Sequence, residues 1–185
     1  MVSIGELWQA VLVAAVLVFV VSSALHMLPT WHKNDYPKLA NEDAVLAALR
    51  PLQLPPGDYM VPRASSGADA KNPAFVEKFT KGPVVVLTVA KRAQAGMGKN
   101  LVQWFAFTVV VGLFVAYVAG RALGPEASYL RVHQIAGAVA FGCYAFASWP
   151  MSIWYYRSWG NAAKETADAL IYSMLTGGAF GWLWP

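Results

Sequence analysis

The sequence predicts an all-α membrane protein with four transmembrane helices in a bundle and a small α/β-type extramembrane loop region between helices one and two. Three observations predict it. Four apolar stretches follow one another, each near the roughly 20 residues that a helix needs to cross a bilayer: residues 7–28, 101–120, 129–156 and 168–184. They are continuous rather than alternating, which is typical of membrane helices and not of membrane strands. Charged residues make up only 13% of the 185 residues, about half the share in soluble domains.

These stretches divide the chain into three predicted regions: residues 1–28 (first transmembrane helix), 29–100 (extramembrane loop region) and 101–185 (three-helix transmembrane region). The first stretch lacks the positively charged segment that opens a secretory signal peptide, so we expect it to be a retained helix. The third stretch contains Pro150, which is expected to kink a long helix near one end.

Residues 29–100 are too many for a plain connector and predict short elements of their own. Asn41 is expected to cap a helix at 42–50, and Asn72-Pro73 to open a second at 74–80. The composition of residues 63–72 predicts a mobile loop.

The β-branched run VVVLTV at residues 84–89 predicts a strand. Its expected partner is the extended segment 59–61, in a hairpin-like pair. The alternative is that the run lies unpaired along the membrane interface.

The distribution of charge predicts the orientation of the helices. Four crossings put both termini on one side, where Arg121 and Arg131 lie near the membrane. The other side has more basic residues near the membrane: Lys33, Lys38, Lys91, Arg92, Lys99, Arg157 and Lys164. Positive charge concentrates on the cytoplasmic side, so we expect a multi-pass membrane protein with the long loop cytoplasmic and both termini on the opposite side. The dispersed charges predict the lipid bilayer and not nucleic acid as a partner.

Small residues recur every four positions and predict faces where helices pack closely. The predicted helix-packing residues are Gly112, Ala116, Gly120, Ala138, Gly142, Ala169, Ser173, Gly177 and Gly181. They can serve packing inside the bundle, or they can dock other membrane subunits or a second copy. Tryptophans near the ends of the stretches are expected to be interfacial anchors: Trp31, Trp149, Trp154, Trp159, Trp182 and Trp184. A bundle this small is expected to leave little room for a private cavity.

The candidate chemistry is sparse. His26 and His133 fall at opposite ends of the predicted bundle, so they cannot clamp one haem. The single cysteine, Cys143, lies mid-span, and nucleophile, zinc-protease and phosphate-loop motifs are missing. We therefore expect no cofactor and no catalytic residues.

A metal site has only weak candidates in the sequence. His26, Met27 and His32 lie together at the loop side, with Met60 and Met97 in the loop, and histidine with methionine suits copper. Interfacial packing is the expected alternative, because no MxxM or HxH repeat accompanies them.

Residues 32–35 are expected to form a solvated turn. Asp168, the deepest carboxylate, is expected to pair with Lys164 or with the helix dipole.

The loop-side segments carry a resemblance. His-Met-Leu-Pro-Thr-Trp-His at 26–32, Asn-Glu-Asp-Ala-Val-Leu at 41–46, Pro-Gly-Asp-Tyr-x-x-Pro at 56–62 and Gly-Pro-Val at 82–84 resemble a group of small uncharacterised bacterial four-helix membrane proteins. The resemblance implies a bacterial inner membrane and no particular activity.

Three functions fit the sequence. The first expectation is a non-catalytic accessory or structural subunit of a larger bacterial membrane assembly. The first alternative is a homo-oligomeric channel or small transporter, for which only Gln103 and Thr108 offer polar positions on the second helix. The other is a metal-handling membrane protein that uses His26 and His32.

Overall fold

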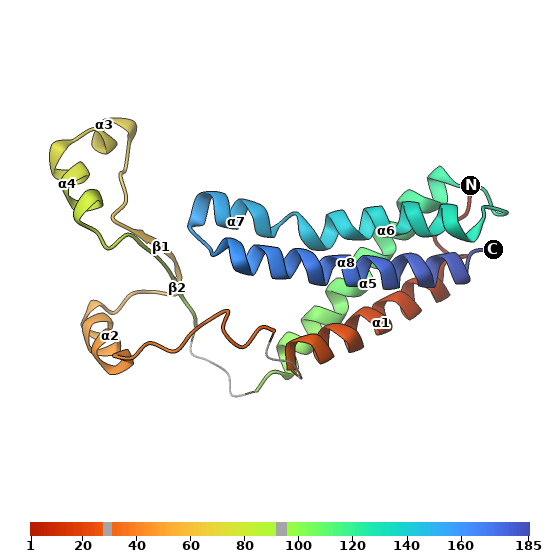
Figure 1. The fold of residues 1–185 in the computed structure, drawn as a ribbon, viewed down its shortest axis with the longest axis horizontal. Coiled ribbons are helices and arrows are strands. Elements are labelled where there is room, and N and C mark those ends of the chain that lie inside the picture. The colour runs from red at the N-terminus through yellow and green to blue at the C-terminus, as the bar shows by residue number, and fades with distance from the viewer. Residues whose placement is uncertain (28–30, 92–95) are drawn as a thin grey trace. The chain divides into compact units, whose positions relative to one another are not determined.

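The computed structural model describes residues 1–27, 31–91 and 96–185, which form two compact units (Figure 1). Unit 1 comprises residues 1–37 and 96–185, and unit 2 comprises residues 38–95. The predicted boundary between residues 28 and 29 lies outside the described residues.

Unit 1 is helical. Its helices are α1 (Trp8–Met27), α5 (Gly98–Ala122), α6 (Tyr129–Ala145), α7 (Ser148–Tyr155) and α8 (Trp159–Trp182). Helix α8 packs against α1, α6 and α7, and α5 packs against α1 and α6. The two termini lie at the same end of this unit (Figure 1). There the Val2 amide donates to the Gly120 carbonyl at 2.9 Å, and Trp184 Nε1 donates to the Gly124 carbonyl at 2.9 Å.

The chain is mostly helical, and two of its helices, α1 and α5, are long and apolar enough to cross a membrane. By length and composition these two helices support membrane association. Helix α6 has only 17 residues, and α8 begins with a polar stretch that lowers its mean hydropathy. The four-span topology therefore stays a prediction.

The third apolar stretch is broken rather than kinked. Helix α6 ends at Ala145 and α7 begins at Ser148, with a turn at residues 146–147. Pro150 explains the break, because it has no N–H to donate to the Phe146 carbonyl and its ring would collide with that carbonyl in a continuous helix. Within the first turn of α7 the missing N–H removes no hydrogen bond, because N–H groups in the first turn have no partner inside the helix.

Unit 2 contains α2 (Glu42–Leu49), a 3₁₀ turn η1 (Arg50–Leu52), β1 (Gly57–Val61), α3 (Gly67–Ala70), α4 (Pro73–Lys81) and β2 (Val85–Val89). The two strands pair antiparallel with Tyr59 opposite Leu87. This confirms the predicted pair and excludes an unpaired β2. The short helices α2 and α4 are also confirmed within a residue or two.

Two local predictions in unit 2 were wrong. The Asn41 side chain makes no capping hydrogen bond among the described residues, although Asn41 precedes α2. The expected mobile loop contains α3, which forms because the Ser66 hydroxyl accepts a hydrogen bond from the Asp69 amide at 3.1 Å. By contrast, Asn72 caps α4 by accepting from the Ala74 amide at 2.9 Å.

Glycines allow the helices of unit 1 to approach closely. A Cβ added at Gly112 would lie 3.1 Å from Val11 Cγ1, and one at Gly177 would lie 2.8 Å from the His133 carbonyl oxygen. At Gly181 an added Cβ would lie 2.7 Å from the Tyr129 ring, and at Gly120 it would collide with the Val2 carbonyl.

The other predicted packing residues are placed as follows. Ala116, Ala169 and Ser173 are buried. A Cβ added at Gly142 would lie 3.7 Å from the Phe146 ring, an ordinary contact, and Ala138 is exposed. The buried residues of α6 are Val132, Ala136, Ala140 and Ala145.

Most of the predicted anchor tryptophans are exposed: Trp31, Trp149, Trp154, Trp159 and Trp182. Trp184 packs against the core of unit 1 instead. Exposed indole rings at both ends of the helices fit an interfacial position.

Candidate functional site

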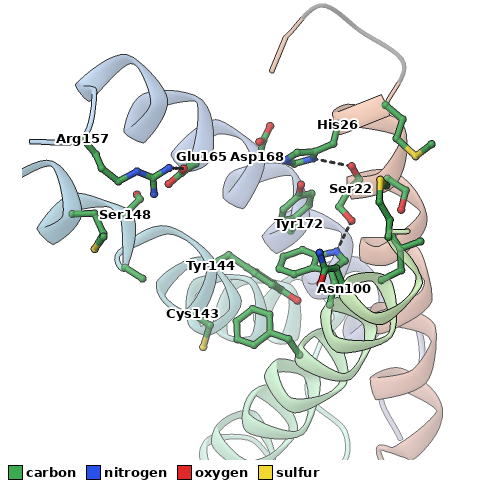
Figure 2. A pocket seen from close by; sticks show the side chains of 18 residues that line it. Ser22, His26, Asn100, Cys143, Tyr144, Ser148, Arg157, Glu165, Asp168 and Tyr172 are labelled. Carbon is green, nitrogen blue, oxygen red and sulfur yellow. Dashed lines mark hydrogen bonds and ion pairs between the residues drawn. The ribbon is translucent and has the colours of Figure 1, made fainter. Parts of the chain in front are cut away.

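Unit 1 contains an open cavity of about 680 Å³ that sequence reasoning missed (Figure 2). Its lining includes Ser22 and His26 of α1, Trp104 of α5, Tyr144 of α6, and Tyr172 of α8. The expectation of little interior space was wrong. Space remains where α6 breaks off into α7, since Ala147 and Ser148 at that break line the cavity.

Aromatic rings form one part of the cavity wall. The Tyr144 and Tyr172 rings meet edge to face with centroids 5.5 Å apart, and Trp104 lies 6.4 Å from Tyr172 and 6.3 Å from Tyr144. Phe107 adds a fourth ring, 5.5 Å from Trp104. Trp104 Nε1 donates to the Ser22 hydroxyl at 2.8 Å, which fixes the indole against α1.

The last turn of α1 orients His26 toward this cavity (Figure 2). Its Nδ1 lies 2.9 Å from the Ser22 carbonyl oxygen. A carbonyl oxygen can only accept, so Nδ1 carries a proton in this bond, and in the neutral imidazole Nε2 is then the nitrogen with the free lone pair. His26 is exposed, so a solute can reach that nitrogen.

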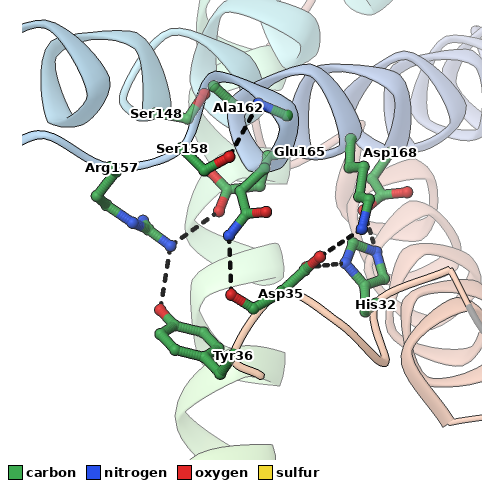
Figure 3. Close-up of polar contacts among 12 residues, drawn as sticks. His32, Asp35, Tyr36, Ser148, Arg157, Ser158, Ala162, Glu165 and Asp168 are labelled. Carbon is green, nitrogen blue, oxygen red and sulfur yellow. Dashed lines mark hydrogen bonds and ion pairs between the residues drawn. The ribbon is translucent and has the colours of Figure 1, made fainter. Parts of the chain in front are cut away.

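His32 lies between two carboxylates (Figure 3). Its Nδ1 is 2.6 Å from Asp35 Oδ2, and its Nε2 is 2.8 Å from Asp168 Oδ2. The His32 side chain is only 10% exposed, and Asp35 only 14%. The predicted turn at residues 32–35 is present, since the Asp35 amide donates to the His32 carbonyl at 3.1 Å and Lys33 and Asn34 are exposed, but the His32 and Asp35 side chains are largely buried and not solvated.

Asp168 does not form the predicted ion pair with Lys164. Lys164 Nζ donates to Asp35 Oδ1 at 2.5 Å, and Asp168 faces His32 instead. Burial alone would raise the pKa of the Asp35 carboxyl, but the hydrogen bonds from Lys164 and His32 outweigh it and hold that pKa below its ordinary value. Asp35 therefore stays ionised and is a strong acceptor for the His32 N–H.

The result is a cluster of three groups that can ligate a metal: His26, His32 and Asp168. One ligand atom from each lies within 4.8 Å of the other two. The histidine rings stack with centroids 4.1 Å apart and planes 3° apart. The two histidines could be recognised as candidate ligands from the sequence. Asp168 could not, because it is separated from His32 by 136 residues.

The other candidates from the sequence lie outside this cluster. Met27 and Met97 line the cavity, and Met60 belongs to β1 of unit 2. His133 lines a separate, shallower pocket with Gln134 and Phe141. Cys143 lines the main cavity and is a free thiol.

Comparison of the chain with protein-family models, with curated proteins and with solved structures finds no match. What the cluster does has to be inferred from its own residues.

Proposed function

We propose that the protein is a metal-handling membrane protein that holds one divalent transition-metal ion on His26, His32 and Asp168. The observation that carries this proposal is the convergence of two imidazoles and one carboxylate beside a cavity. Two histidines and one carboxylate form a ligand set for Zn²⁺ or Fe²⁺, and they leave coordination positions open for water or a substrate.

The distances allow such a site once the side chains move closer together. Ligand atoms bonded at about 2.1 Å to a tetrahedral zinc lie roughly 3.4 Å apart. The three groups lie within 4.8 Å of one another, so side-chain rotations that bring the ligand atoms together by about 1 Å close the site. His26 is exposed, so an ion can reach the cluster from solvent at this residue.

The surrounding hydrogen bonds favour the same interpretation. Metal-bound histidines usually donate their other ring N–H to a carboxylate or a backbone carbonyl, which fixes the ring. Asp35 and the Ser22 carbonyl occupy these two positions toward His32 Nδ1 and His26 Nδ1. Lys164 in turn holds Asp35.

Charge balance gives a further argument. Asp35 and Asp168 bring two negative charges, and Lys164 supplies one positive charge. One negative charge is left over, so the cluster attracts a cation, which would take the place of any proton at His32 Nε2.

We further propose that α6 with α7, and α8, complete four crossings of a bacterial inner membrane, with both termini periplasmic. The meeting of the two termini at one end of unit 1 supports an even number of crossings. The small residues give little support to the accessory-subunit function. Gly112, Gly120 and Gly177 make close contacts within the chain, so they do not offer a free surface for another subunit.

Zinc titration of the purified full chain tests the metal proposal. After removal of metal with a chelator, we expect the protein in mild detergent to bind one Zn²⁺ per chain. Asp168→Asn keeps the shape of the side chain but removes the anionic ligand, so the retained zinc should fall at least tenfold. His26→Ala, at an exposed position, should have a similar effect.

Two variants serve as controls. Glu165→Gln removes a carboxylate one turn earlier on α8, where Glu165 pairs with Arg157 at 3.2 Å, and His133→Gln removes the histidine of the separate pocket. Both should bind zinc like the parent. If Asp168→Asn and the parent retain equal zinc, the metal site is contradicted. The cluster would then have only a structural role, in which hydrogen bonds hold the segment at His32 against α8.

A further inference from the structure

The Tyr172 hydroxyl is a buried polar group without a partner. Tyr172 is 4% exposed, and its hydroxyl forms no hydrogen bond within the described part of the chain. More than nine in ten buried polar groups in proteins are paired, and an unpaired one destabilises a fold. Tyr172 lines the main cavity, so a small rotation of its side chain would let a molecule in that cavity supply the partner.

The rings around Tyr172 define the shape of such a molecule. Tyr144 meets Tyr172 at 76° and Trp104 meets it at 63°, so the wall presents both edges and faces of rings. An aromatic ligand packs well against such a wall in stacked or edge-to-face contact. A volume of about 680 Å³ is also that of a small-molecule site, which is typically mostly apolar with a few polar groups.

We propose that the cavity binds a planar aromatic molecule of the phenol class. Its ring packs against Trp104 and Tyr144, and its oxygen hydrogen-bonds to the Tyr172 hydroxyl. A lipid acyl chain could fill the same space, but it carries no oxygen to pair with Tyr172, so the buried hydroxyl favours the phenol.

The ligand would lie beside the proposed metal, because His26 and Asp168 line the same cavity (Figure 2). Its binding rests on Tyr172 and the aromatic wall and requires no metal. Binding is therefore measured in the presence of a chelator, and a failure of the metal proposal would not affect the result.

The test compares two probes that differ in one hydroxyl, 4-fluorophenol and fluorobenzene. Fluorine NMR titration follows each probe against the full chain in detergent. We expect 4-fluorophenol to bind about 3–10-fold more tightly than fluorobenzene, the gain from one hydrogen bond. In Tyr172→Phe the ratio should fall to about 1, while fluorobenzene binds as before. The two probes partition differently into detergent, so each affinity is corrected for partitioning measured without protein; the remaining error is the same for the parent and for Tyr172→Phe and cancels between them.

Tyr117→Phe is the matched control, because Tyr117 is an exposed tyrosine of α5 that does not line the cavity, and its loss of a hydroxyl should keep the ratio. Equal binding of the two probes to the parent chain would overturn the proposal, as would a ratio that survives in Tyr172→Phe. Binding of neither probe, together with a lipid that co-purifies in the cavity, would assign the cavity to an acyl chain and would also overturn it.

Discussion

Gly177→Leu is expected to prevent α8 from packing on α6 and to abolish accumulation of the folded protein. An added Cβ alone would lie 2.8 Å from the His133 carbonyl oxygen and 3.1 Å from His133 Nδ1. The first of these is a backbone atom of α6, so the two helices have to separate. Helices in lipid associate through such close contacts, and a leucine side chain would remove this one.

The alanine variants of two adjacent glycines measure the effect more finely. Gly177→Ala should lower the free energy of unfolding by about 1–3 kcal/mol, as overpacking generally does. At Gly178 an added Cβ has only an ordinary contact, 3.8 Å from the Tyr129 hydroxyl, so Gly178→Ala should be neutral or slightly stabilising. Thermal unfolding in detergent compares them, and equal stability of the two variants would show that α8 and α6 do not meet closely at Gly177.

His32→Ala is expected to destabilise unit 1 by about 3 kcal/mol, because it leaves Asp168 buried without its partner. The Asp168 side chain is 5% exposed, and His32 Nε2 lies 2.8 Å from it. The exposed neighbour Lys33 provides the control, and Lys33→Ala should change stability by less than about 0.5 kcal/mol.

A double-mutant cycle then separates this contact from other effects of His32. His32→Ala with Asp168→Asn should cost less than the sum of the two single variants, because the neutral amide no longer suffers from the loss of the imidazole. The unfolding free energies are measured in metal-free buffer. Strict additivity would mean that the two side chains do not interact in the folded protein.

The parts of the fold that could be predicted from sequence depend on local signals. The β-branched run at residues 84–89 and the Asn72-Pro73 pair each specify structure within a few residues, and β2 and α4 form there. Pro150 correctly indicated that the helix is interrupted nearby. A proline is compatible with either a kink or a break, so the sequence could not decide between them. In the structure the helix breaks, and α7 packs against α8.

The candidate site could be predicted only in part. His26 and His32 are close in sequence, so the pair could be found. Asp168 joins them through the fold, and Lys164, one turn before it on α8, offered an equally good local partner. Lys164 contacts Asp35 instead. The spacing of residues along the chain indicates neither this contact nor the contact between His32 and Asp168. The cavity was missed because it depends on where α6 ends.

X-ray absorption spectroscopy of the zinc-loaded protein tests most directly whether two imidazoles and one carboxylate hold the metal. We expect nitrogen and oxygen neighbours at about 2.0–2.1 Å and the outer-shell scattering of two imidazole rings, with the carboxylate contribution altered in Asp168→Asn. A sulfur neighbour near 2.3 Å would place the zinc on Cys143, and a spectrum of hydrated zinc alone would show that the cluster binds no metal.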